Sequence, residues 1–155
     1  MSKWREQFDA SAAQGMPAHI TVLYPFLPQD RLTEEVLAQL AEMCAQSPVL
    51  DVQFQRAARF PGVIYLDPEP ADGLRQLTLA IAAGWPEASP YGGVFDEVIP
   101  HLTVAYGSDA RVLDDIESDV LRGLPLSTRL VDACVYRFDG DHWRLRARMP
   151  FQGSS

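Results

Sequence analysis

The sequence has no long apolar run. No stretch approaches the roughly 20 consecutive apolar residues of a membrane-spanning helix. The first residues, MSKWREQFDA, lack the apolar segment of a secretory signal. These absences predict a chain that does not cross a membrane, and we expect a cytoplasmic location.

Cysteine and positive charge are also scarce. Cys44 and Cys134 lie in unlike patterns without C-x-x-C spacing, so we expect free, buried thiols with no catalytic role. The chain has 13 Lys and Arg against 21 Asp and Glu, a net charge of −8 at pH 7. Extended binding along a nucleic acid needs clustered cations. The charge therefore argues against such binding, and a nucleic-acid ligand would be small or held at its end.

No Ser/Gly-rich segment or single-sign charge run divides the 155 residues, which favours a single domain, residues 1–155. Apolar and β-branched periodicity separates expected strands from expected helices. Thr33 and Asp72 are the expected helix caps in the first half, and the third helix is expected from about Asp109. The expected strands are 19–24, 49–55, 62–68, 101–106 and two C-terminal runs within 126–139 and 142–149, and the expected helices are 33–47, 72–84 and 109–121.

The second half of the chain repeats the first at an offset of 82 residues, which lays His19 on His101 and Thr21 on Thr103. A helix and two strands follow each of these positions. The repeat predicts two pseudo-symmetric lobes with motif halves at about 15–84 and 97–151. We expect an α+β fold, a bilobal duplicated unit with two antiparallel sheets backed by helices around a central cleft.

Both repeated strands carry the motif His-x-Thr. Side chains alternate along a strand, so His19 and Thr21 face one way while Ile20 and Val22 face the core. An imidazole can take or give a proton near neutral pH, and a threonine hydroxyl can donate to a phosphate oxygen. Two histidines across a phosphate supply a general base and a general acid. The predicted catalytic residues are His19 and His101, and the predicted phosphate-binding residues are Thr21 and Thr103.

A lone strand histidine more often donates to a neighbouring carbonyl than performs catalysis. The matched pair at equivalent positions reverses that preference. A catalytic zinc site needs three protein ligands, and no third ligand lies at suitable spacing beside either motif, so we expect neither a metal nor a cofactor. His142 has no threonine two residues later, and we interpret it as structural.

The segments PAHITVLYPF and IPHLTVAYG resemble the paired signatures of the two-histidine (2H) phosphoesterase superfamily, specifically its bacterial 2'-5' RNA ligase-like (LigT-like) branch. PGVIYLDPEP and the Pro-Tyr-Gly-Gly loop are also similar to that branch. The resemblance implies a metal-independent phosphodiesterase that cleaves a 2',3'-cyclic phosphate or related phosphodiester on a nucleotide or RNA end. Some members also join 2'-5' RNA ends. By this analogy His101 is the base and His19 the acid, although the repeat leaves the reverse assignment open.

Further aromatic and basic residues are candidates of lower rank. Tyr24 and Tyr106 lie near the expected cleft rim as substrate contacts, or else pack within the sheet. Tyr91, beside Gly92 and Gly93, belongs either to a lid over the site or to an ordinary turn. Arg144, Arg146 and Arg148 alternate along a strand; this pattern favours a solvated edge over a substrate contact.

One departure from the resemblance concerns the N-terminus. Similar proteins have a further strand before the first motif, whereas residues 1–17 are short and polar. Either that strand is lacking or the N-terminal segment replaces it, and an open sheet edge would permit pairing. We therefore expect a monomer, with a dimer as the alternative.

Two functions other than catalysis remain open. The chain could be a non-catalytic module that binds a nucleotide or RNA end, or a structural protein that mediates association. The matched acid and base favour an enzyme over both, because binding alone does not require them. Among substrates, a sugar-nucleotide cyclic phosphate competes with an RNA end.

Overall fold

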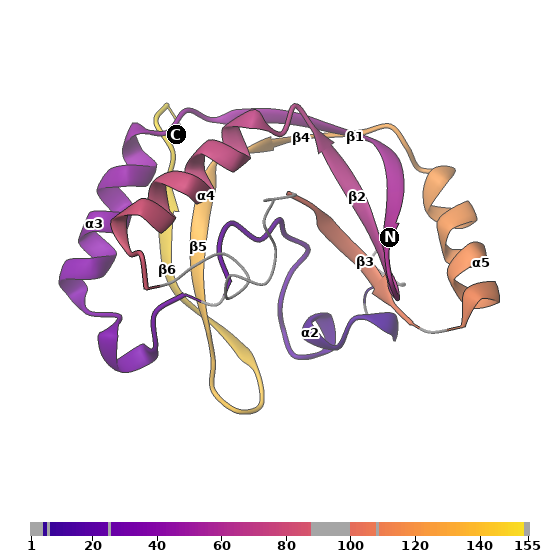
Figure 1. The fold of residues 1–155 in the computed structure, drawn as a ribbon, viewed down its shortest axis with the longest axis horizontal. Coiled ribbons are helices and arrows are strands. Elements are labelled where there is room, and N and C mark those ends of the chain that lie inside the picture. Colours follow the sequence, from indigo (N-terminus) through magenta and orange to yellow (C-terminus); the bar gives the residue numbers. More distant parts are fainter. Residues whose placement is uncertain (1–4, 6, 25, 88–99, 108, 154–155) are drawn as a thin grey trace.

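The computed structural model describes residues 5, 7–24, 26–87, 100–107 and 109–153. Within them the chain forms two antiparallel sheets flanked by helices, which confirms the predicted α+β class (Figure 1). No helix in this part of the chain is long and apolar enough to cross a bilayer. In chain order the elements are α2 (Ala10–Ala13), η1 (Gln29–Arg31), α3 (Glu34–Gln46), β1 (Leu50–Phe60), β2 (Val63–Glu69), α4 (Asp72–Gly84), β3 (Leu102–Tyr106), α5 (Ala110–Leu121), β4 (Leu126–Leu130), β5 (Asp132–Phe138) and β6 (Trp143–Pro150).

The larger sheet has the strand order β3-β2-β1-β4, and each neighbouring pair is antiparallel. A tight turn joins β1 to β2 at Gly62, whose φ of 74° lies in the left-handed region that favours glycine. The Gly62 carbonyl accepts a hydrogen bond from the Gly107 amide at 2.9 Å. The tip of this hairpin is thereby tied to the end of β3.

One face of the larger sheet is buried against α5. Burial alternates along β2, so that Ile64 and Leu66 enter the core while their neighbours do not. From α5, Ile116 is fully buried in the same cluster. Burying a large aliphatic side chain stabilises the fold by about 1.5–3 kcal/mol. This alternation fixes which face packs on α5 and leaves the opposite face to polar side chains.

The smaller sheet, β5-β6, belongs to a second core with α3 and α4, which lie beside it (Figure 1). Helix α3 begins as predicted, because the Thr33 hydroxyl accepts a hydrogen bond from the Val36 amide at 3.3 Å. The predicted cap of α4 was wrong by one position. Asp72 is the first helical residue, and the N-cap position is Ala71, which has no side-chain acceptor.

The two halves of the sequence are interleaved in space. Strands β1 and β2, from the earlier half, pair with β3 and β4 of the later half and are backed by α5. Strands β5 and β6, from the later half, pack against α3 and α4 of the earlier half. Each sheet with its helices therefore draws on both halves of the repeat.

The expected strand over residues 19–24 was wrong. This segment forms one isolated antiparallel bridge, from Ile20 to Leu102. Its later part packs on α4 instead: the Val22 carbonyl accepts from the Thr78 hydroxyl at 2.7 Å, and the Phe26 ring contacts the Trp85 ring edge-on at 5.3 Å. The segment is therefore held against α4 and does not form a continuous strand ladder.

The N-terminal segment, where it is described, contributes a helix rather than a strand. The short α2 is followed by Gln14, whose carbonyl accepts from the Trp143 amide at 2.8 Å at the start of β6. Arg5 and Asp9 form a buried ion pair of 3.3 Å, and Arg5 also donates to the Met16 carbonyl. Among residues 5 and 7–24, the chain thus forms a helix joined to β6 and no strand.

Candidate active site

The second His-x-Thr motif lies at the beginning of β3. Leu102 and Val104 are buried in the core on the α5 side, whereas His101 and Thr103 are half-buried. Thr103 pairs directly with Tyr65 of β2, so these two side chains share the sheet face opposite α5. For this motif the predicted alternation is correct.

The bridge between Ile20 and Leu102 brings the two motifs side by side. In an antiparallel pair, residues on either side of a bridge align in reverse order. A pairing continued by one residue on each side would set His19 opposite Thr103 and Thr21 opposite His101, but the structure forms the bridge alone. Figure 1 shows the first motif's segment running between the β5-β6 sheet and β3. The bridge therefore places the backbones of the two motifs next to each other.

The His19 side chain is held by a backbone carbonyl. Its Nδ1 lies 2.8 Å from the Pro17 oxygen. A carbonyl oxygen only accepts hydrogen bonds, so Nδ1 carries the proton and donates to it. The other ring nitrogen, Nε2, is then the atom that can exchange a proton with a substrate.

The His101 ring lies among aromatic side chains. It meets Phe60 at 5.3 Å and Tyr65 at 5.4 Å between ring centroids, both edge-on. Phe60 and Tyr65 stack on each other at 4.3 Å. Edge-on aromatic pairs of this kind each contribute about 0.5–1.5 kcal/mol beyond the area that they bury. Phe60 and Tyr65 therefore orient the imidazole of His101.

A charged group adjoins this aromatic cluster. Arg56 donates to Asp67 at 2.6 Å and lies 3.4 Å from Glu69, and Arg56 and Asp67 are cross-strand partners. The pKa of Tyr65 is raised mainly by burial and further by the Asp67 carboxylate, while the Arg56 cation opposes the rise. The Tyr65 hydroxyl is thus close to both charges and stays protonated at neutral pH.

Sequence reasoning assigned no role to Phe60, Arg56 or Asp67. The turn at Gly62 could have indicated where Phe60 lies, because a tight turn between two strands fixes which of their residues face each other. The pairing of Arg56 with Asp67 follows only from the register of β1 with β2, which shifts by one residue between Phe54 and Arg56.

The predicted tyrosine contacts have different outcomes. Tyr24 and Tyr106 are exposed, with 56% and 51% of their surface accessible. Both rings are therefore available to a ligand rather than packed within a sheet. Tyr91 lies outside the described residues.

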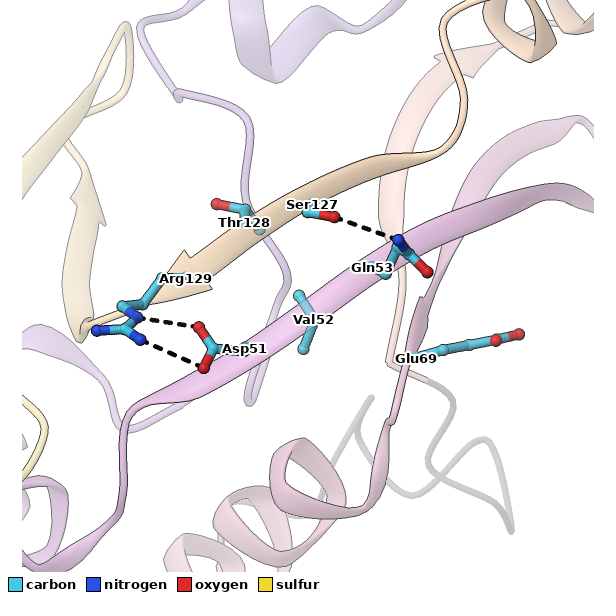
Figure 2. A pocket seen from close by; sticks show the side chains of 7 residues that line it. All are labelled: Asp51, Val52, Gln53, Glu69, Ser127, Thr128 and Arg129. Carbon is cyan, nitrogen blue, oxygen red and sulfur yellow. Dashed lines mark hydrogen bonds and ion pairs between the residues drawn. The ribbon is translucent and has the colours of Figure 1, made fainter.

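A depression of about 400 Å³ lies farther along the same sheet (Figure 2). Arg129 donates to Asp51 at 2.9 Å on one side of it, and the Gln53 amide donates to the Ser127 hydroxyl at 3.3 Å on the other. None of the predicted site residues lines it. Its lining residues are Asp51, Val52, Gln53, Glu69, Ser127, Thr128 and Arg129.

The two cysteines are free, and they differ in exposure. Cys44 is free and buried as expected, and burial raises the pKa of its thiol. Cys134 is free but exposed, so the expectation of burial was wrong; its strand neighbours Ala133 and Val135 turn toward the core instead. Among the described residues, no group of at least three His, Cys, Asp or Glu side chains is arranged to hold a metal ion.

The C-terminal arginines do not form one stripe. The register of β5 with β6 shifts between Val135 and Tyr136, and this irregularity breaks the alternation that the sequence suggested. Each arginine has its own carboxylate partner: Arg144 pairs with Asp139, Arg146 with Glu34, and Arg148 with Asp132.

The fold is similar to those of solved bacterial proteins. Among solved structures, TT0787 of Thermus thermophilus superposes with a TM-score of 0.63 at 15% identity, covering 90% of this chain and 82% of that chain. Escherichia coli LigT complexed with ATP gives a TM-score of 0.59 at 18% identity, covering 97% of this chain and 87% of that one. At these identities the likeness concerns the fold.

Relatives by sequence have names that class them as phosphoesterases. A Geobacillus kaustophilus protein is 29% identical over 66% of this chain and 58% of its own length. A Staphylococcus aureus protein is 24% identical over 94% of this chain and 86% of its own length. The match thus spans little more than half of the first protein and most of the second. The model of the 2'-5' RNA ligase superfamily matches residues 1–142, and the chain belongs to this family.

Proposed function

We propose that this chain is a metal-independent phosphodiesterase that hydrolyses a 2',3'-cyclic phosphate or a related phosphodiester on a nucleotide or RNA end. Family membership and the names of the relatives support an enzyme of the phosphoesterase kind. The bridge between Ile20 and Leu102 is the observation that carries the proposal, because it brings both His-x-Thr motifs together.

In the proposed reaction His101 removes a proton from water, and the water oxygen forms a bond to phosphorus. The bond from phosphorus to one ribose oxygen breaks in line, and His19 gives its proton to that departing oxygen. His19 performs this step as the imidazolium: its Nδ1–H stays bonded to the Pro17 carbonyl, and its Nε2–H is the proton that it gives. Thr21 and Thr103 donate to the non-bridging oxygens, whose charge grows in the transition state.

The surrounding residues support a nucleotide substrate. In this proposal the exposed rings of Tyr24 and Tyr106 contact the nucleoside, and Tyr91 is a further candidate contact. Solved LigT structures contain ATP and 3'-AMP, which supports a nucleotide here by analogy. Ligation of 2'-5' RNA ends would use the 5'-hydroxyl of a second RNA end in place of water: its oxygen bonds to the cyclic phosphorus, and the 3' oxygen leaves with a proton. We also propose a cytoplasmic, monomeric protein.

The test is hydrolysis of the four nucleoside 2',3'-cyclic phosphates in EDTA by wild type, His19→Ala and His101→Ala. Loss of a general acid or base lowers kcat by about 10²–10⁴-fold. His142→Ala is the matched control, since His142 is an exposed histidine that pairs with Asp141 on the β5-β6 hairpin. We expect full activity from His142→Ala, and a bell-shaped pH profile with both limbs near neutrality.

Loss of wild-type activity in EDTA that zinc restores would overturn the two-histidine mechanism. Saturable nucleotide binding without turnover by folded wild type would instead favour the binding-module alternative.

A further inference from the structure

A second candidate site lies near the turn of the β5-β6 hairpin, away from the His-x-Thr pair. A cavity of about 480 Å³, partly open to solvent, lies there between β5, β6 and the segment that contains η1. In Figure 1 this hairpin end projects below the rest of the sheet. The cavity is lined by Gln29, Leu32, Arg137, Arg144, Leu145 and Arg146.

Two arginines of this cavity are direct cross-strand partners. Arg137 of β5 pairs with Arg144 of β6, and both side chains line the cavity, so they share one face of the sheet. Like charges directly opposite each other in an antiparallel pair destabilise the sheet. A local arrangement that opposes folding is typical of a functional position.

The positive charge of Arg137 is not neutralised by a carboxylate in the part of the chain that is described. Its neighbours in the cavity are neutralised: Arg144 donates to Asp139 at 2.8 Å, and Arg146 donates to Glu34 at 2.7 Å. Arg137 of β5 and Arg111 of α5 are the two arginines that form no ion pair with a described residue. In a protein of net charge −8, a cation left unpaired beside a second arginine indicates an anionic ligand.

The chemistry of the lining identifies the ligand class. Guanidinium groups present planar pairs of donors that match phosphate oxygens. Leu32 and Leu145 add apolar surface, and Leu145 is 47% exposed. We propose that this cavity binds an organic phosphate, with its phosphate group on Arg137 and Arg144 and its apolar part against Leu32 and Leu145. This inference goes beyond the proposed function and does not depend on it.

The experiment follows the arginine Nε–H signals of the full chain by NMR during titration with 5'-AMP and, separately, with inorganic phosphate. We expect saturable shifts of the Arg137 and Arg144 signals, with 5'-AMP binding at least about tenfold more tightly because the two leucines contact its nucleoside. The shifts are specific to each residue, so ligand bound at the His-x-Thr motifs is distinguished from ligand bound here. Absence of shifts at Arg137, or equal affinity for the two ligands, would overturn the proposal.

Variants separate a binding role from a structural one. Arg137→Ala should weaken 5'-AMP binding at this cavity about tenfold or more, since a hydrogen bond to a charged group is lost. Arg111→Ala removes the same charge from another exposed, unpaired arginine and should leave the affinity unchanged. Arg137→Ala should also keep or raise Tm, because the repulsion from Arg144 is removed. Equal weakening by both variants, or a lower Tm for Arg137→Ala, would contradict the proposal.

Discussion

At the level of single residues, the two histidines have different environments despite matching sequence motifs. His19 is held through Nδ1 by the Pro17 carbonyl, which selects its tautomer. His101 is oriented by the edges and faces of Phe60 and Tyr65. Unequal surroundings support unequal roles, because the tautomer and orientation of an imidazole determine which proton transfer it can perform.

Phe60 provides a test of this orientation. Replacing it by leucine keeps apolar volume but removes one of the two ring contacts of His101. Such a contact is worth about 0.5–1.5 kcal/mol, so kcat should fall about three- to tenfold while KM changes less. Phe26→Leu is the matched control, since that ring contacts Trp85 instead. Steady-state kinetics on a cyclic nucleotide would measure both, and equal effects of the two variants would contradict the orienting role.

Tyr65 gives a prediction about pH. Its pKa is raised in the folded protein by burial and by Asp67, so the phenol stays neutral throughout the pH range of the expected activity. The alkaline limb of the rate profile should therefore not belong to Tyr65. The Tyr65→Phe variant, measured from pH 5 to 9, should keep both limbs at the wild-type positions. A missing or displaced alkaline limb in this variant would show that the phenol, rather than an imidazole, titrates there.

At the level of elements, the β5-β6 hairpin depends on one exposed carboxylate. Asp139 accepts from the amides of Asp141 and His142 at 2.9 and 2.7 Å, and from Arg144 at 2.8 Å. These contacts, the His142 amide first, hold the pKa of Asp139 well below its usual range. The side chain thus organises the turn next to the cavity that is lined by Arg137 and Arg144.

Removing this carboxylate should destabilise the protein in a pH-dependent way. A carboxyl group with a lowered folded pKa contributes its full stability above its unfolded value of 3.8 and loses it as pH falls below that value. Asp139→Ala should lower Tm by about 2–4 °C at pH 7. The difference from wild type should shrink from pH 4 toward pH 3 in thermal unfolding. A difference that stays constant over this range would assign the effect to packing rather than to charge.

The sequence predicted those elements whose signals are local. Helices α3 and α5, strands β2 and β3 and the first half of β1 follow from the periodicity of their own residues, whereas the prediction for β1 stopped at residue 55, before Arg56 and Phe60. The segment after His19 has an equally strong strand pattern, yet its carbonyl at Val22 is used by Thr78 of α4. The contact of Phe60 with His101 likewise depends on a hairpin register and a long-range pairing. Contacts between residues distant in sequence therefore account for what could not be predicted.

At the level of the whole molecule, the fold rests on two apolar cores built from interleaved halves of the chain. One lies between the larger sheet and α5, and the other includes α3, α4 and the smaller sheet. Leu130, at the end of β4, packs against both. Two residues later β5 begins, so this side chain lies where the chain passes from one sheet to the other. We infer that Leu130 couples the unfolding of the two cores.

The prediction compares Leu130→Ala with Leu50→Ala in urea. The two leucines are cross-strand partners, and both are half-buried, but Leu50 packs against the first core alone. Each variant should lose about 1–3 kcal/mol of unfolding free energy. Leu130→Ala should also show a lower apparent m-value, because the cores then unfold at different urea concentrations, whereas Leu50→Ala should shift the midpoint and keep m. In a background that carries Trp4→Phe and Trp143→Phe, the fluorescence of Trp85 reports on the second core alone. Followed together with far-UV circular dichroism, it should reveal two non-coincident transitions in Leu130→Ala, and coincident transitions in both variants would refute the coupling.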